Sequence, residues 1–326
     1  MSSHFSNSRR LGLIAAIVFV AACSKPGEQA ELASSVDTGM DTLVTAEWLS
    51  EHLGDPDLVV LDCTVIVEAT EEGGFRSVNG RANFEAGHIP TAGFADLMGD
   101  LADGDSPYEF ALPTPDQFAA AMGALGVGND TRVVLYDTYN SAWAARVWWM
   151  LRWIGFDRAA ILDGGLNAWK AGDRPLSTEP AEHLARTLTP AVRPQMIAGR
   201  DEVFAATEDD AVSLIDSLPA GHYRGDWTMY GRAGHIQGAS NVPTTSTVDD
   251  SGRYLPAEQL EAIFGGDHNA RAITYCGGGI AAASNAFVMT RLGFTDVAVY
   301  IASLQEWTAD PANPMETATE FDEFDE

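Results

Sequence analysis

Residues 271–283 have the sequence RAITYCGGGIAAA, in which a short apolar run is followed by a cysteine, three glycines and a run of small residues. The pattern predicts a strand over 272–275 and a helix that starts just after the glycines. Cysteine chemistry requires the thiolate, and N–H groups of a glycine-rich loop at a helix N-terminus stabilise an anion. We therefore interpret Cys276 as a nucleophile, with a buried structural cysteine as the alternative. The anion-binding loop is assigned to Gly277, Gly278, Gly279, Ile280 and Ala281.

The two halves of the chain repeat one another. The sequence AGHI at 86–89 recurs at 233–236, and RVVLYD at 132–137 corresponds to RAITYC at 271–276. Matches that keep their order along the chain indicate one domain that has been duplicated. In the first half an aspartate, Asp137, stands where the second half has its cysteine.

Each half has the pattern of an α/β fold. Thr114, followed by Pro115 and Gln117, predicts the start of a helix that ends near Gly126, and a second helix is expected over 143–154. Strands that alternate with helices form mainly parallel sheets flanked by helices. The apolar runs that predict strands are 58–61, 133–136, 212–215, 272–275 and 297–300.

Composition limits the classes of partner. The 326 residues carry a net charge of −28, which disfavours nucleic acid and anionic membrane surfaces. The chain has no CxxC pair and no Cys/His group at zinc spacing, so we expect no metal and no cofactor. Cys63 and Cys276 lie in different halves, each near a strand end, and are predicted to be free thiols.

The N-terminus has the pattern of a secretory signal. Two arginines, Arg9 and Arg10, precede the apolar run 11–20, and the sequence VAAC then ends at Cys23. This pattern resembles the bacterial lipobox, which implies a signal peptide over 1–22 and a lipid on Cys23; an ordinary signal peptide is the alternative. The resemblance implies an extracytoplasmic lipoprotein that faces the periplasm and contacts the membrane only through its anchor, and the next residue is compatible with sorting to the outer membrane.

Changes in composition divide the rest of the chain. Small and polar residues predict a tether, and a polar stretch that contains proline separates the two halves. The last residues are strongly acidic. The expected segments are a tether at 23–41, a first domain at 42–176, a linker at 177–194, a second domain at 195–310 and an acidic tail at 311–326.

Taken together, these motifs resemble the rhodanese (sulfurtransferase) family, in which tandem members carry the nucleophile in the second domain. The resemblance implies that the Cys276 thiolate takes the outer sulfur of a donor such as thiosulfate and becomes a persulfide. A thiol or cyanide then accepts the sulfur, in two-step covalent catalysis without a cofactor. It also implies small-molecule partners, and we expect a monomer with an inactive first domain.

The sequence departs from the family pattern at the residues that select the donor. Thiosulfate-specific members usually have Arg and Lys after the cysteine, and mercaptopyruvate-specific members have a Ser there; this chain has Gly277 and Gly278. Phe110 stands at the position of the relay histidine. The relay of the mercaptopyruvate enzymes is therefore expected to be absent.

A further departure concerns the substrate arginine of the second domain, which corresponds to His222. A histidine cannot match the paired donors of a guanidinium. Arg224 and Arg232 are nearby and are candidates to compensate, although Arg224 is equally compatible with an exposed surface role. His88 and His235 occur in both halves and are interpreted as turn residues.

Three alternatives remain open. A non-catalytic sulfur carrier or persulfide sensor would load Cys276 without an efficient donor pocket. A structural envelope protein would have a buried, unreactive Cys276. A cysteine phosphatase is disfavoured, because its loop needs an arginine at the position of Ala282.

Overall fold

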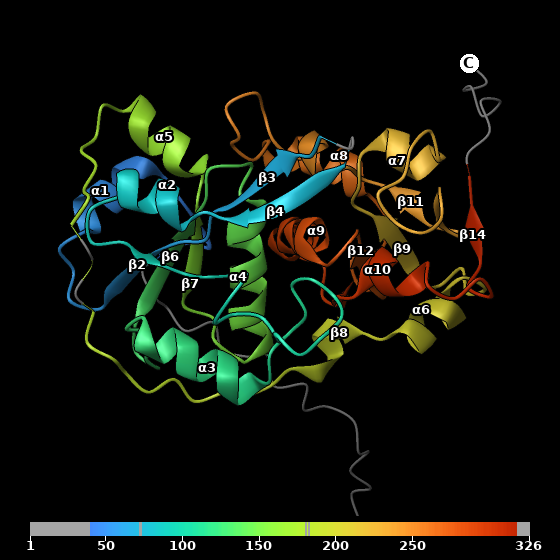
Figure 1. The fold of residues 1–326 in the computed structure, drawn as a ribbon, viewed down its shortest axis with the longest axis horizontal. Coiled ribbons are helices and arrows are strands. Elements are labelled where there is room, and N and C mark those ends of the chain that lie inside the picture. The colour runs from blue at the N-terminus through green and yellow to red at the C-terminus, as the bar shows by residue number, and fades with distance from the viewer. Residues whose placement is uncertain (1–39, 72–73, 180, 182, 318–326) are drawn as a thin grey trace, which may run out of the picture. The chain divides into compact units, whose positions relative to one another are not determined.

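The computed structural model describes residues 40–71, 74–179, 181 and 183–317 (Figure 1). The predicted signal peptide, Cys23 and most of the predicted tether lie outside the described residues, as does the end of the acidic tail. The described residues belong to one compact unit.

The first half is built on a five-stranded sheet in which every pair of neighbours is parallel. The strands that the sequence predicts at 58–61 and 133–136 form adjacent central strands. In order across the sheet the strands are β1 (Leu43–Val44), β7 (Ala159–Leu162), β6 (Arg132–Tyr136), β2 (Leu58–Asp62) and β5 (Gly93–Phe94).

Helices and one antiparallel hairpin complete this half. Thr114 caps α3 as predicted, since its side chain accepts the N–H of Gln117 and the Gln117 side chain accepts the N–H of Thr114. The helices are α1 (Ala46–His52), α2 (Arg81–Ala86), α3 (Pro115–Ala124), α4 (Ala142–Trp153) and α5 (Gly165–Ala171), and the hairpin is β3 (Val65–Ala69) with β4 (Phe75–Asn79).

The second half has a five-stranded parallel sheet with the same order of equivalent strands. Across the sheet these are β11 (Ser240–Asn241), β9 (Ser213–Asp216), β12 (Ala272–Tyr275), β13 (Val297–Tyr300) and β8 (Ile197–Ala198). Its helices are α6 (Arg200–Ala206), α7 (Ala220–Arg224), α8 (Ala257–Phe264), α9 (Ile280–Leu292) and α10 (Ser303–Trp307), with 3₁₀ turns η1 (Pro194–Met196) and η2 (Thr244–Ser246). The predicted class, α/β with two repeated domains, is confirmed.

The ordered fold continues past residue 310, where the sequence pattern places the start of the acidic tail. Strand β14 (Met315–Glu316) pairs with β10 (His235–Ile236) in a two-stranded antiparallel sheet. The side chain of Asn313 is buried and donates to the carbonyl of Trp307. The second half therefore extends at least to these residues.

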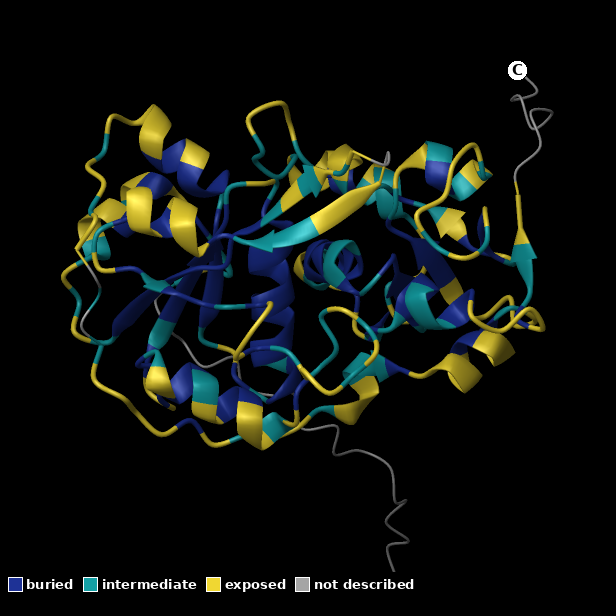
Figure 2. Ribbon diagram, in the orientation of Figure 1, coloured by how far each residue is buried: buried dark blue, intermediate teal, exposed yellow. Residues whose placement is uncertain are grey.

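The two halves share one core. Helix α4 of the first half packs along α9 of the second, and both are largely buried (Figure 2). Trp148 and Phe287 meet edge to face across this interface, with ring centroids 4.8 Å apart. Because the anion loop lies at the start of α9, this packing places first-half residues beside Cys276.

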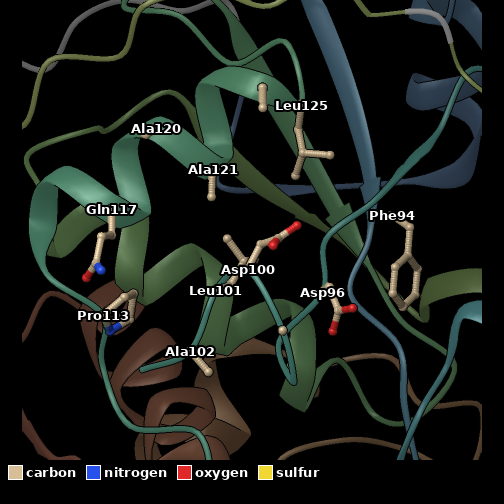
Figure 3. A pocket seen from close by; sticks show the side chains of 12 residues that line it. Phe94, Asp96, Asp100, Leu101, Ala102, Pro113, Gln117, Ala120, Ala121 and Leu125 are labelled. Carbon is tan, nitrogen blue, oxygen red and sulfur yellow. The ribbon is translucent and has the colours of Figure 1, made fainter. Parts of the chain in front are cut away.

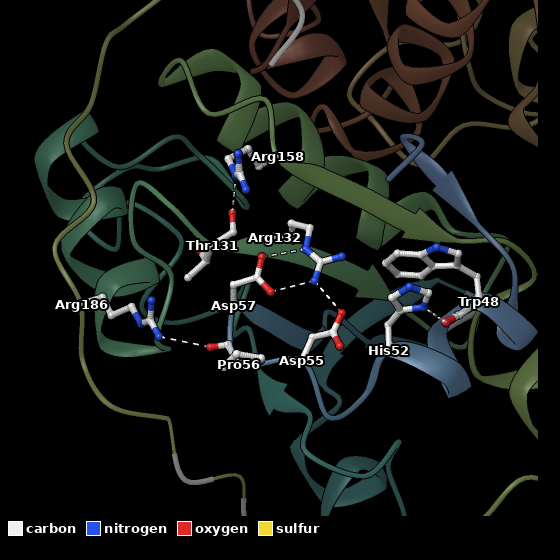
Figure 4. A network of polar contacts seen from close by, with 9 residues as sticks. All are labelled: Trp48, His52, Asp55, Pro56, Asp57, Thr131, Arg132, Arg158 and Arg186. Carbon is white, nitrogen blue, oxygen red and sulfur yellow. Dashed lines mark hydrogen bonds and ion pairs between the residues drawn. The ribbon is translucent and has the colours of Figure 1, made fainter. Parts of the chain in front are cut away.

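Equivalent arginines hold the start of the central strand in each half. Arg132 donates two hydrogen bonds to the carboxylate of Asp57 and a third to Asp55 (Figure 4). In the second half Arg271 bonds Glu202 and Asp296. These pairs lie at the opposite end of the strands from Cys276, so they stabilise the scaffold rather than the site.

Among the described residues no helix is both long and apolar enough to span a bilayer.

Candidate active site

Cys276 follows the last residue of β12 and lies at the N-terminus of α9. The N–H of Gly279 donates to its Sγ at 3.1 Å. The thirteen-residue helix α9 begins at the next residue, so the partial positive charge of its N-terminus also faces the sulfur. The loop is thus arranged to stabilise a thiolate.

The three glycines serve two different purposes. Gly279 alone has a positive φ, 80°, and forms the N-cap of α9. Gly277 and Gly278 are needed for space, since a Cβ on Gly277 would lie 1.4 Å from the Tyr230 hydroxyl, and one on Gly278 would lie 2.3 Å from Nε2 of Gln305. Tyr230 and Gln305 therefore occupy the volume that side chains at these positions would fill.

The turn after β13 fixes the loop. The Oγ of Ser303 accepts the N–H of Cys276 at 3.1 Å and donates to the carbonyl of Tyr300. Ser303 has φ 50°, and the equivalent Gly165 of the first half has φ 53°. A serine accepts the strain of this conformation here and supplies a hydroxyl that a glycine lacks.

The first half contributes to the site through Glu109 and Arg146. The N–H of Glu109 donates to Oε1 of Gln305 at 2.9 Å, which turns the Nε2 end of that amide toward the loop. Arg146, on α4, is buried and donates to the carbonyls of Phe110 at 2.7 Å and Gly279 at 3.4 Å.

Arg146 is a buried cation without a carboxylate partner among the residues that the structure describes. Burial lowers the pKa of Arg146 to about 10, while the negative charge of a Cys276 thiolate raises it. The guanidinium therefore remains charged at neutral pH and stabilises negative charge on the sulfur.

Phe110, at the position of the relay histidine, packs against Trp143 with ring centroids 5.3 Å apart. Its backbone carbonyl serves the site through Arg146, but its side chain is apolar. The relay that the sequence predicts to be missing has no substitute at this residue.

His222 is fully buried, and neither ring nitrogen has a hydrogen-bond partner among the described residues. Its ring meets Tyr230 and Trp227 edge-on, with centroids 5.6 Å and 5.2 Å away. Burial lowers the pKa of His222, so the ring is neutral at neutral pH. His222 therefore lies beside Tyr230 but adds no positive charge.

The two arginines expected to compensate are engaged elsewhere. Arg224 is half exposed and pairs with the carboxylate of Asp226 at 2.5 Å. Arg232 donates to the carbonyls of Asp310 and Asn313. Within the described structure, neither guanidinium is directed at Cys276 by a hydrogen bond.

The two turn histidines have structural partners. His88 lies between the carbonyls of Phe84 and Glu179, and His235 stacks on Tyr223 at 3.6 Å. These contacts agree with the interpretation of both residues as turn residues.

Asp137 shows what the same loop does in the first half. Its carboxylate accepts four backbone N–H groups at 2.7–3.2 Å, from Tyr139, Ser141, Trp143 and Ala144. The loop in this half is thus filled by a carboxyl group of the protein itself. Burial nevertheless raises the pKa of Asp137 to about 7.

Cys276 is free but only 3% exposed, and Cys63 is a free, fully buried thiol. The side chains of Tyr230 and Gln305 and the backbone of Glu109 lie against the loop. A separate groove of about 510 Å³ between α3 and the segment after β5 is lined only by first-half residues (Figure 3).

No group of three or more His, Cys, Asp or Glu in the described ranges could hold a metal ion.

Comparison with known proteins agrees with this geometry. The model of the rhodanese-like domain matches residues 45–172 and again 200–310. The chain is 34% identical over 279 residues to 3-mercaptopyruvate sulfurtransferase of Escherichia coli (strain K12), covering 84% of this chain and 97% of that protein. It is 32% identical over 278 residues to thiosulfate sulfurtransferase of Cricetulus griseus, covering 81% and 91%.

A solved structure gives the same result for the fold. The crystal structure of SseA from Escherichia coli, a 3-mercaptopyruvate sulfotransferase with the rhodanese fold, aligns with a TM-score of 0.71 and 33% identity over 80% of this chain and 98% of that one. The chain therefore belongs to the family of sulfurtransferases with two rhodanese-like domains.

Proposed function

We propose that this sulfurtransferase moves a sulfane sulfur from a donor such as thiosulfate to a thiol or cyanide through a persulfide on Cys276. The observation that carries the assignment is the bond from the N–H of Gly279 to Sγ, in the half of the molecule that has a cysteine at this position. The thiolate attacks the outer sulfur of the donor, and sulfite leaves with the electron pair of the broken sulfur–sulfur bond.

The persulfide keeps the negative charge in the same place. Its terminal sulfur is an anion, and in this proposal the backbone groups of Gly277, Gly278, Gly279, Ile280 and Ala281, at the start of α9, bind it. The acceptor then attacks the terminal sulfur and restores the thiolate. Arg146 supports both anionic states from behind the loop.

Thiocyanate formation from thiosulfate and cyanide tests this proposal. Cys276→Ser should abolish turnover, whereas Cys63→Ala should retain it, because Cys63 lies in the core of the first half. Full activity in Cys276→Ser would contradict this mechanism.

A sulfur carrier without efficient turnover is the second candidate. It is favoured by the burial of Cys276 and by the absence of a guanidinium hydrogen-bonded to its sulfur within the described residues. A Cys276 persulfide that forms, but is discharged by no acceptor at a rate above the uncatalysed one, would establish this role.

We further propose that the enzyme is a lipoprotein held at the cell envelope by Cys23 and facing the periplasm. The basic, apolar and small-residue pattern that ends at this cysteine supports the proposal. Incorporation of a labelled fatty acid into the wild-type chain, and its loss in Cys23→Ser, would test it.

A further inference from the structure

The site offers neutral hydrogen-bond donors where a thiosulfate enzyme would need positive charge. Tyr230 places its hydroxyl against Gly277, and Gln305 places its Nε2 against Gly278. Both side chains come from segments far from the loop in sequence. These two side chains occupy the space that side chains at positions 277 and 278 would otherwise fill, so a hydroxyl and an amide group lie beside the loop.

Few positive charges face this arrangement in the described part of the chain. Arg224 and Arg232 are engaged with other groups, and His222 is buried, which disfavours its charged form. Arg146 faces the loop, and its single charge offsets the single charge of the Cys276 thiolate.

Negative charge lies close by as well. Burial raises the pKa of the Tyr230 hydroxyl, and the negative charges of a Cys276 thiolate, Glu109 and Asp216 raise it further. Thiosulfate would bring two further negative charges into this site, and the chain as a whole carries −28. Uncompensated charges in a partly desolvated site are unfavourable.

The loop that carries Tyr230 also has an apolar character. Trp227 and Met229 are 42% and 46% exposed, and Trp227 meets the ring of His222. His222 in turn has two buried ring nitrogens without a hydrogen-bond partner among the described residues. Buried polar groups normally have such a partner, so these nitrogens are available to a bound ligand.

We propose that Tyr230, Gln305 and His222 form an uncharged donor subsite that prefers sulfane donors with one negative charge and an apolar group over dianionic thiosulfate. This inference rests on the function proposed above and names its donor class: organic thiosulfonates and hydropersulfides. Tyr230 is the specificity-determining residue, since its hydroxyl donates to an oxygen or sulfur of the donor without losing its proton.

Methanethiosulfonate is the matched probe, because it replaces one oxygen of thiosulfate by a methyl group. In the loading step the bond between Sγ of Cys276 and the sulfane sulfur forms. The bond between the sulfane and sulfonyl sulfurs breaks, and methanesulfinate leaves with its electron pair. No proton is transferred, and the total charge of −2 is the same on both sides.

The experiment compares kcat/KM for the two donors with cyanide as acceptor. Each value is divided by the rate constant of the uncatalysed reaction of that donor with cyanide, so that intrinsic reactivity cancels. The wild type should prefer methanethiosulfonate at least tenfold, and Tyr230→Phe should lose about tenfold in kcat/KM for it. A normalised preference for thiosulfate would overturn the inference.

A charge-introducing variant gives an independent check. His222→Arg should raise kcat/KM for thiosulfate at least tenfold, while Leu184→Arg, which adds the same charge at an 86% exposed position, should leave the donor ratio unchanged. If His222→Arg does not fold, the wild-type ratio and Tyr230→Phe decide the matter. If neither donor puts sulfur on Cys276, the proposed function itself fails; if both do and thiosulfate is faster, only the subsite is wrong.

Discussion

At the scale of single residues, the two halves differ in the acidic side chain that one loop holds. Cys276 Sγ accepts the N–H of Gly279, whereas Asp137 accepts four N–H groups from its own loop and the start of α4. The carboxylate is an internal substitute for the sulfur anion. This explains why the first half keeps the loop but carries no nucleophile there.

The titration of Asp137 should appear in the pH dependence of stability. Because burial raises its pKa to about 7, above the usual value near 4, the folded state binds the proton more tightly than the unfolded state. Wild type should therefore lose stability relative to Asp137→Asn as the pH rises from about 4 to about 7, by at most about 1.4 kcal/mol per pH unit. Denaturant unfolding at several pH values measures this, and a slope of the opposite sign would mean that the four N–H groups outweigh burial.

Gly277 should not tolerate a side chain while Tyr230 is present. Gly277→Ala is expected to lower the free energy of unfolding by about 1–3 kcal/mol, because the new Cβ would overlap the Tyr230 hydroxyl. Tyr230→Ala should remove most of this penalty in a double-mutant cycle. Gly54→Ala is the control, since a Cβ there would meet no described heavy atom within 4 Å apart from its chain neighbours. Equal losses at both glycines would contradict the steric account.

At the scale of elements, α4 supplies a cation to a site on the other half. Arg146 joins α4 to the loop before α9 and to the carbonyl of Phe110. The sequence places the residue on a buried helix but gives no sign that the helix packs beside Cys276.

Arg146→Met should lower sulfur transfer at least tenfold and slow the alkylation of Cys276 by iodoacetamide at fixed pH. The volume is kept and the charge opposite the thiolate is lost. The carbonyls of Phe110 and Gly279 each lose a donor, but no carboxylate among the described residues is left unpaired, so the chain should still fold. Arg152→Met on the same helix removes a guanidinium paired with Asp157 and should leave both rates unchanged. If the two substitutions lowered both rates equally, the proposed effect of the Arg146 charge on Cys276 would be contradicted.

Much of the fold follows from local patterns, whereas most of the site does not. The strands at 272–275 and 297–300 have the predicted bounds, because parallel strands that are covered on both faces are rich in apolar residues. The sequence around Tyr230 and Gln305 does not predict a role in the site. Their role depends on the space beside two glycines that are distant in sequence, and this space is known only from the fold. Ser303 is visible in the sequence only as a departure from glycine, and its bond to the N–H of Cys276 requires the fold.

At the scale of the whole molecule, the duplicated halves form a single functional unit. The core is continuous across α4 and α9, and the first half contributes the side chain of Arg146 and the backbone of Glu109 to the site. Loss of the interface should therefore abolish activity and folding together.

Trp148→Ala should lower the free energy of unfolding by about 3–5 kcal/mol, because it opens a cavity against Phe287. Unfolding followed by tryptophan fluorescence and by the reactivity of Cys276 should coincide in one transition in the wild type. Leu184→Ala, at an exposed position, should change stability by less than about 0.5 kcal/mol. Separate transitions for the two probes would show that the halves fold independently.

The most direct test of the central claim is mass spectrometry of the intact protein and its peptides after exposure to a sulfane donor. We predict a mass increase of one sulfur atom on the peptide that contains Cys276, removed by cyanide and absent in Cys276→Ser. Sulfur found on Cys63 instead, or no cyanide-labile sulfur with any donor, would contradict the account.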